Sequence, residues 1–268
     1  MPETTTEAPA GEQSRETMLT MGFLDHLEEL RTRLVYSIAA VAVGFFACWW
    51  KVEAIYDIMQ RPIMKALHDN GMSDKLVYLN PVEPFNLYLK IAALAGLFLT
   101  SPFVLYQVWM FISPGLYRHE RRYVVPFMFS TIALFVSGGF FGYKVVYPQA
   151  LNFLIHFGRQ FQPMITIGEY TSLFLSIILG MGVIFEMPIL IFFLALMGMV
   201  SAGFMWKNFR YAILVIFIIA AIVTPTPDVL NMCIFAAPMI GLYALSIGIA
   251  WMVHPKQRRA RKEKQAGV

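Results

Sequence analysis

The stretch that decides the fold is YTSLFLSIILGMGVIFEMPILIFFLALMGMV, which runs from Tyr170 to Val200 and carries one charged residue, Glu186. Roughly 20 apolar residues in a helix cross the hydrocarbon core of a bilayer, so this stretch is long enough to span a membrane. It exceeds what a straight crossing needs. We therefore expect the helix to tilt, or to kink at Pro188.

Similar apolar runs recur along the chain, which has 268 residues, 58% of them hydrophobic and 14% charged. That composition lies outside the usual range of soluble domains. The sequence therefore predicts an all-α polytopic membrane protein with six transmembrane helices. The expected spans are residues 34–50, 85–112, 124–147, 170–200, 211–223 and 230–253.

Basic residues indicate how the spans are oriented. With both termini on one side, fourteen lysines and arginines lie on that side and six on the other. The positive-inside rule then places both termini in the cytoplasm. The six cations expected on the outer side are Lys51, Arg61, Lys65, Lys75, Lys144 and Arg159.

Three parts follow from this pattern. Residues 1–20 are polar and acidic, and we expect a disordered cytoplasmic tail. Residues 21–253 form the six-span membrane domain. Residues 254–268 form a basic cytoplasmic tail that we expect to rest on anionic lipid. No nucleic-acid-binding module accompanies this tail, so we expect no nucleic-acid partner.

Two segments between spans are expected on the outer surface. AIYDIMQRPIMKAL (residues 54–67) has apolar residues at helical spacing, which predicts an amphipathic helix lying there. Residues 148–169 mix apolar and polar residues and are expected to form a second cap. Two caps on one side, with short connections on the other, indicate a bundle that is concave on one face.

The fifth span is unusually short. Its thirteen residues cover about 20 Å, against a hydrocarbon core of about 30 Å. The turn that follows, TPTPD (residues 224–228), cannot be helical at both prolines. We therefore expect this hairpin to stop short of the outer surface, with local thinning of the bilayer or entry of water.

No motif of an enzyme is visible. GxxxxGK[ST] is absent, and the five histidines are too scattered to predict a metal site. We expect neither a cofactor nor a catalytic activity. A secondary transporter with Glu186 as its coupling acid is an alternative, although no internal repeat is visible. A membrane-embedded enzyme is a second alternative, for which no catalytic constellation is present.

Acids stand where the chain enters the membrane, in FLDHLEELRTRL (residues 23–34). On a helix, Glu29 lies one turn from Arg33, so ion pairs within the helix are one interpretation. A second acid, Glu120 of YRHERR, reaches the same face, where it could cap a helix start. Together the two carboxylates would also suit a pair of arginines on another peptide, because the guanidinium fork meets a carboxylate bidentately.

Four motifs carry a resemblance to a known family. FLDHLEELRTRL and SPFVLYQVWMFISPGLYRHERR (residues 101–122) resemble the two signatures of TatC, the signal-peptide receptor family of the twin-arginine protein translocase. FEMP (residues 185–188) and TPTPDVLNM (residues 224–232) resemble its later motifs. The resemblance covers about residues 23–253. It implies a six-span, glove-shaped protein of the bacterial inner membrane with both termini in the cytoplasm.

The resemblance also implies roles for particular residues. Glu29 and Glu120 match the carboxylates that bind the two arginines of a signal peptide. The other matched positions are Arg31, Arg118, Arg121 and Arg122 on the recognition surface, Glu186 deep in the fourth span, and Asp228 as the acid of the outer turn.

The family's partners follow from the same resemblance. They are folded cargo proteins with twin-arginine signal peptides, TatA, and TatB, the last in an oligomer of TatB–TatC units, with transport driven by the proton motive force. The sequence departs from the family at Tyr243 and Ala244, where many members carry a glutamate after the aromatic residue. A docking point for a partner helix is therefore expected to be absent or moved.

Glu186 has two interpretations, because a carboxylate is costly in lipid and is expected to be neutral there. In the first, the protonated acid bonds backbone carbonyls that Pro188 leaves free. In the second, it forms a polar floor that meets an inserted signal peptide or a partner helix.

Overall fold

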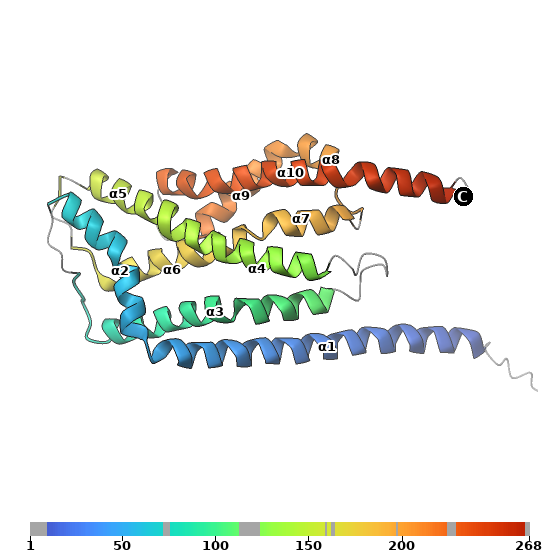
Figure 1. Cartoon of the computed structure of the whole chain (residues 1–268), viewed down its shortest axis with the longest axis horizontal. Coiled ribbons are helices and arrows are strands. Elements are labelled where there is room, and N and C mark those ends of the chain that lie inside the picture. Colours follow the sequence, from blue (N-terminus) through green and yellow to red (C-terminus); the bar gives the residue numbers. More distant parts are fainter. Residues whose placement is uncertain are drawn as a thin grey trace, which may run out of the picture.

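The computed structural model describes residues 10–71, 76–112, 124–158, 160–161, 164–196, 198–223 and 229–265. Within these residues the elements are helical, apart from an isolated bridge between Val77 and Thr166. The start of α1 (Ala10–Trp49) and the end of α10 (Val229–Gln265) lie at the same end of the bundle (Figure 1). We name this end the terminal face and the opposite end the distal face.

The remaining elements run between these two faces. Helix α2 (Val52–Asp69) crosses the distal face, and α3 (Glu83–Ile112) lies beside α1 (Figure 1). The others are α4 (Val124–Phe141), η3 (Gly142–Val146), α5 (Tyr147–Phe157), α6 (Ile167–Ile184), α7 (Met187–Leu196), α8 (Ala202–Lys207) and α9 (Phe209–Val223).

The described residues contain five segments long and apolar enough to cross a membrane, together with one shorter apolar helix. These segments confirm the predicted all-α polytopic class. The shorter helix, Phe209–Ile222, corresponds to the fifth span, which was expected to be short. The five long segments are Asp25–Trp49, Glu83–Phe111, Phe127–Phe157, Ile167–Ala195 and Met232–Trp251.

The third span is longer than the sequence predicted. Its helix was expected to end at Tyr147, yet α4, η3 and α5 continue to Phe157. The π-helical turn η3 precedes Pro148, and its wider ring, closed by the amide of Tyr147 on the carbonyl of Gly142, admits the proline near the start of α5. Residues 148–157 therefore continue the helix of the third span, so this part of the expected second cap is a helical extension of that span.

The fourth span breaks close to where a kink was expected. Helix α6 ends at Ile184 and α7 begins at Met187, so Phe185 and Glu186 form the break. Pro188 lies in the first turn of α7, where its missing N–H needs no partner. The kink therefore lies two residues before the proline.

The predicted tail boundaries are not visible as breaks in the helices. Helix α1 begins at Ala10, inside the segment expected to be disordered, where glutamate, methionine and leucine favour helix. Helix α10 continues from the last span through the basic residues to Gln265. These two helices therefore extend beyond their apolar spans, Asp25–Trp49 and Met232–Trp251.

Helix α2 confirms the amphipathic helix predicted for residues 54–67. Its Pro62 has no amide hydrogen, which leaves the carbonyl of Ile58 without its helical partner. The hydroxyl of Tyr143 donates to that carbonyl at 2.6 Å. The hydroxyl of Tyr170 donates to the carbonyl of Met59 at 2.8 Å. Two tyrosines of the membrane bundle therefore hold α2 across the distal ends of the spans.

Helices α1 and α3 approach each other closely through two glycines. A Cβ built on Gly96 would lie 2.6 Å from the backbone nitrogen of Phe45, and one on Gly44 would lie 2.8 Å from the carbonyl oxygen of Gly96. Small residues allow such close packing between membrane helices. This contact sets how the polar residues of α1 face those of α3 nearer the terminal face.

Candidate functional site

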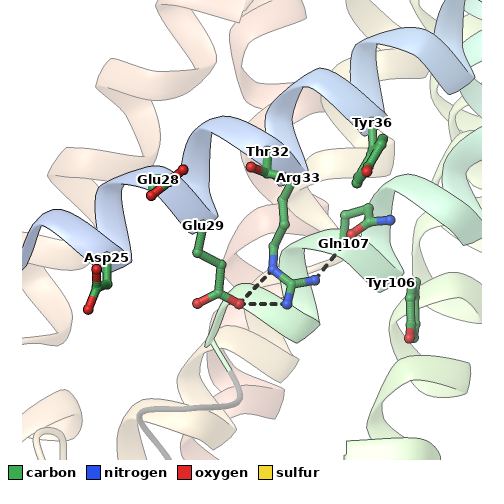
Figure 2. A pocket seen from close by; sticks show the side chains of 8 residues that line it. All are labelled: Asp25, Glu28, Glu29, Thr32, Arg33, Tyr36, Tyr106 and Gln107. Atoms are coloured by element: carbon green, nitrogen blue, oxygen red, sulfur yellow. Dashed lines mark hydrogen bonds and ion pairs between the residues drawn. The ribbon is translucent and has the colours of Figure 1, made fainter. Parts of the chain in front are cut away.

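A polar pocket of about 580 Å³ lies between α1 and α3. Figure 2 shows its acids along α1 and its two α3 residues on the opposite wall. Three carboxylates and one guanidinium line it, so its electrostatic character is acidic. The lining residues are Asp25, Glu28, Glu29, Thr32, Arg33 and Tyr36 of α1, and Tyr106 and Gln107 of α3.

Arg33 bridges the two walls of this pocket. Its Nε and Nη2 donate to Oε1 of Glu29, at 2.9 and 2.6 Å. Its Nη1 donates to Oε1 of Gln107 at 3.2 Å (Figure 2). The ion pair is partly shielded, with 21% of the Arg33 side chain and 30% of the Glu29 side chain exposed. The pocket therefore already holds one guanidinium group of its own chain.

The second oxygen of Glu29 is less engaged. Nδ1 of His26 lies 3.9 Å from Oε2, which is beyond hydrogen-bond range. The His26 ring stacks on Phe111 of α3, with centroids 4.4 Å apart. A carboxylate offers about four acceptor sites, so Glu29 keeps capacity for a further donor.

Two of the predicted binding residues, Glu29 and Arg31, lie in different surroundings. Glu29 lines the pocket, whereas Arg31 is exposed on α1 and is not among the lining residues. Glu28 and Arg31 form no ion pair in the part of the chain that the structure describes. Glu120, with Arg118, Arg121 and Arg122, lies outside the described residues, as does Asp228. The pairing of Glu29 with Glu120 stays a prediction.

Two site residues were missing from the sequence interpretation. Arg33 was noted only as an ion-pair partner within its helix, and Gln107 was not singled out. The signal for Gln107 is an amide in an otherwise apolar run, and in the structure the residue is only 7% exposed. A buried amide needs hydrogen-bond partners, and Arg33 supplies one.

Glu186 lies in the break between α6 and α7. Its backbone carbonyl accepts from the amide of Leu190 at 3.0 Å. Its side-chain Oε1 is buried and makes no hydrogen bond with any described residue. The bond to freed backbone carbonyls, which was one of the two expectations for this acid, is therefore not made by Oε1.

The departure from the family pattern lies on α10. The hydroxyl of Tyr243 donates to the carbonyl of Met205 at 3.2 Å, which joins α10 to α8. Ala244 is exposed beside it. Among the described residues, no group of three or more histidines, cysteines or acids could hold a metal ion.

These features define a class: a multi-pass helical membrane protein with a polar pocket between its first two spans. Residues 25–238 match the family model "Sec-independent protein translocase protein (TatC)". The chain belongs to the TatC family, whose members are components of a protein translocase.

Relatives and solved structures agree with this assignment. The TatC protein of Koribacter versatilis (strain Ellin345) is 68% identical over 252 residues, which cover 94% of this chain and 93% of that protein. The TatC protein of Aquifex aeolicus (strain VF5) is 33% identical and covers 90% of this chain and 100% of its own. A crystal structure described as the twin-arginine translocase receptor TatC superposes with a TM-score of 0.77 at 33% identity, covering 85% of this chain and 99% of that one.

Proposed function

We propose that this protein is the signal-peptide receptor of a twin-arginine translocase, and that its terminal face lies in the cytoplasm. The observation that carries the proposal is the acidic pocket between α1 and α3, in which Glu29 already binds a guanidinium group. An incoming arginine would meet the same carboxylate through its free oxygen.

Energetics favour a partly enclosed site for this recognition. An exposed ion pair contributes only about 0.2–1 kcal/mol, whereas a charge-assisted hydrogen bond that is partly desolvated contributes about 1.5–3 kcal/mol. Two bonds of the second kind would separate a twin-arginine peptide from a twin-lysine peptide, because lysine lacks the planar fork.

The second carboxylate in this proposal is Glu120. Helix α3 ends and α4 begins at the terminal face, so the chain between them starts and finishes at the face that carries Glu29 (Figure 1). Arg118, Arg121 and Arg122 accompany Glu120 in the sequence, and we assign them, with Arg31, to the surrounding recognition surface.

Assembly forms the rest of the proposal. The receptor would lie in the bacterial inner membrane and nucleate an oligomeric translocation site with TatB and TatA. The proton motive force would drive transport through this site. We assign Glu186 and the outer-turn Asp228 to partner or signal-peptide contacts. Oε1 of Glu186 is buried and makes no hydrogen bond to a described residue.

Binding of a fluorescent twin-arginine peptide to the purified protein tests the receptor role. We expect Glu29→Ala and Glu120→Ala each to lower its affinity at least about tenfold, which is roughly the loss of one charge-assisted bond. Glu53→Ala, on α2 at the distal face, is the control and should bind normally.

A twin-lysine peptide serves as the ligand control and should bind weakly to all variants. Thermal unfolding of each variant shows that it is folded. Unchanged affinity in both Glu29→Ala and Glu120→Ala would count decisively against the receptor role.

A further inference from the structure

A cationic cavity of about 500 Å³ lies at the distal face, between α2, η3 and α5. Arg61 and Lys65 enter it from neighbouring turns of α2, and Lys144 enters from η3. Asp69 is the one carboxylate among its described lining residues. The cavity therefore has an excess of positive charge.

No carboxylate among the described residues pairs with any of the three cations. Within the described residues, none of them lies within 4.0 Å of a carboxylate oxygen, and the nitrogen of Lys144 lies 5.5 Å from the ring centroid of Tyr143. Three of the six cations expected on the outer side therefore meet in one cavity, on the side where the positive-inside rule leaves cations scarce.

An apolar groove of about 200 Å³ adjoins this cavity. Isoleucine, leucine and phenylalanine side chains of α2, α3 and α6 line it, including Ile91, Phe98 and Ile178. The two spaces share Ile58 and Tyr143. Since the hydroxyl of Tyr143 is bonded to the carbonyl of Ile58, this boundary between the charged and the apolar space is held in place.

The depth of the cavity suits a lipid head group. Helix α2 begins at Val52, two residues after Trp50, which is 84% exposed and follows Trp49. Tryptophan prefers the membrane–water interface, and amphipathic helices lie at the same depth. Helix α2, which lines both the cationic cavity and the groove, is therefore expected to lie at the level of the head groups, where the acyl chains begin.

We propose that this composite space binds an anionic phospholipid of the outer leaflet. Arg61, Lys65 and Lys144 would hold its phosphate and acidic head group, and an acyl chain would occupy the groove beside Tyr143. The site is separate from the acidic pocket and does not depend on the receptor role. A bound lipid would attach α2 to the bilayer, whereas the two tyrosine hydrogen bonds attach it to the helical bundle.

The geometry favours a lipid over other anions. A free phosphate would leave the adjoining apolar groove unused. A partner helix, at about 10 Å in diameter, is too wide for a groove of this volume. Only a ligand with a charged head on a thin apolar chain fits both spaces.

Native mass spectrometry of the full chain in detergent tests the head-group contacts. Phosphatidylglycerol is titrated against zwitterionic phosphatidylethanolamine, and retained lipid is counted. We expect wild type to prefer phosphatidylglycerol, and the triple variant Arg61→Gln, Lys65→Gln, Lys144→Gln to lose roughly tenfold or more in affinity.

The matched control removes the other three outer cations, with Lys51→Gln, Lys75→Gln and Arg159→Gln. It carries the same net charge as the first triple variant and should keep its preference. If both triple variants lost the same affinity for phosphatidylglycerol, the loss would be a general effect of net charge, and the proposed lipid site would be overturned. Displacement of phosphatidylglycerol by millimolar inorganic phosphate would identify a site for free anions and would contradict a phospholipid as the ligand.

Ala95→Phe tests the groove, because the new ring would fill it while the cations stay in place. Phosphatidylglycerol retention should fall, and unchanged retention would contradict an acyl chain in the groove. A phosphatidylglycerol with a photoreactive acyl chain supplies a measurement on wild type. It should label α3 or α6 near Ile91 and Ile178, and labelling elsewhere alone would overturn the proposal.

Discussion

Single polar groups in this bundle differ in how they are satisfied. The carbonyl of Ile58, freed by Pro62, receives a hydrogen bond from Tyr143. Oε1 of Glu186, in contrast, is buried and has no partner among the described residues. A buried group without a hydrogen bond costs about 1–3 kcal/mol, so the first arrangement stabilises the fold and the second is retained at a cost.

The bond of Tyr143 to Ile58 can be measured with a double-mutant cycle. Tyr143→Phe should lower the free energy of unfolding by about 0.5–1.5 kcal/mol, because the hydrogen bond to the carbonyl of Ile58 is then lost. In a Pro62→Ala background the restored amide can bond that carbonyl, and the same substitution should cost less. Thermal unfolding in detergent gives the four values. Equal costs in both backgrounds would show that the proline is not the reason for the bond.

Glu186 can be tested by separating charge from polarity. If the partly buried carboxyl serves as a neutral polar group, Glu186→Gln should transport a twin-arginine cargo normally and Glu186→Leu should not. Transport into inverted membrane vesicles is the measurement. Normal transport by the leucine variant would remove Glu186 from the mechanism.

At the scale of elements, the contact between α1 and α3 positions the acidic pocket. Glycines at the crossing bring the two backbones together, and Arg33 then reaches Gln107 across the gap between the helices. Further along α3, Nε1 of Trp109 donates to the hydroxyl of Thr131 in α4 at 2.9 Å, which ties α3 to the third span. The pocket therefore depends on how these helices pack.

Gly96→Ala tests this dependence. Its new Cβ would lie 2.6 Å from a backbone nitrogen of α1, which cannot rotate away, so α1 must shift. We expect about 1–3 kcal/mol of destabilisation and weaker binding of the twin-arginine peptide. Gly248→Ala in α10 is the control, because nothing lies within 4 Å of its added Cβ. A stable Gly96→Ala variant with normal peptide binding would mean that the close contact does not set the pocket.

At the scale of the whole molecule, the bundle is uneven in height. Helix α9 has 15 residues and is about 22 Å long, against about 30 Å for the hydrocarbon core. In Figure 1 the start of α10 lies farther from the distal face than the end of α5. The last hairpin of the bundle should therefore thin the bilayer or admit water on the distal side.

A cysteine in place of Thr226 reports on that hairpin. Cys48 and Cys233 are free thiols and are first replaced by alanine. A thiol reagent that cannot cross membranes should label position 226 from the outer side, because the short span leaves it accessible to water. A cysteine at Ile218, an exposed position within α9, is the control and should stay unlabelled. Protection of position 226 to the same degree would contradict the thinned region.

The sequence by itself determined the class of protein, the number and approximate places of its spans, the amphipathic helix α2 and the family. Bilayer thickness and helical periodicity act within one segment, so a local pattern is enough to predict them. At Pro148 the helix continues past the residue where the sequence predicted its end, because the π-helical turn just before the proline accommodates it.

The tertiary structure alone decided which distant residues meet. Arg33 and Gln107 are 74 residues apart, and Arg61 and Lys144 come from different elements, so no local pattern relates them. Their meeting depends on where two backbones cross and how closely they pack, and small residues at those crossings leave little trace in a hydrophobic pattern. That is why the acidic pocket could be foreseen only through Glu29, and the cationic cavity not at all.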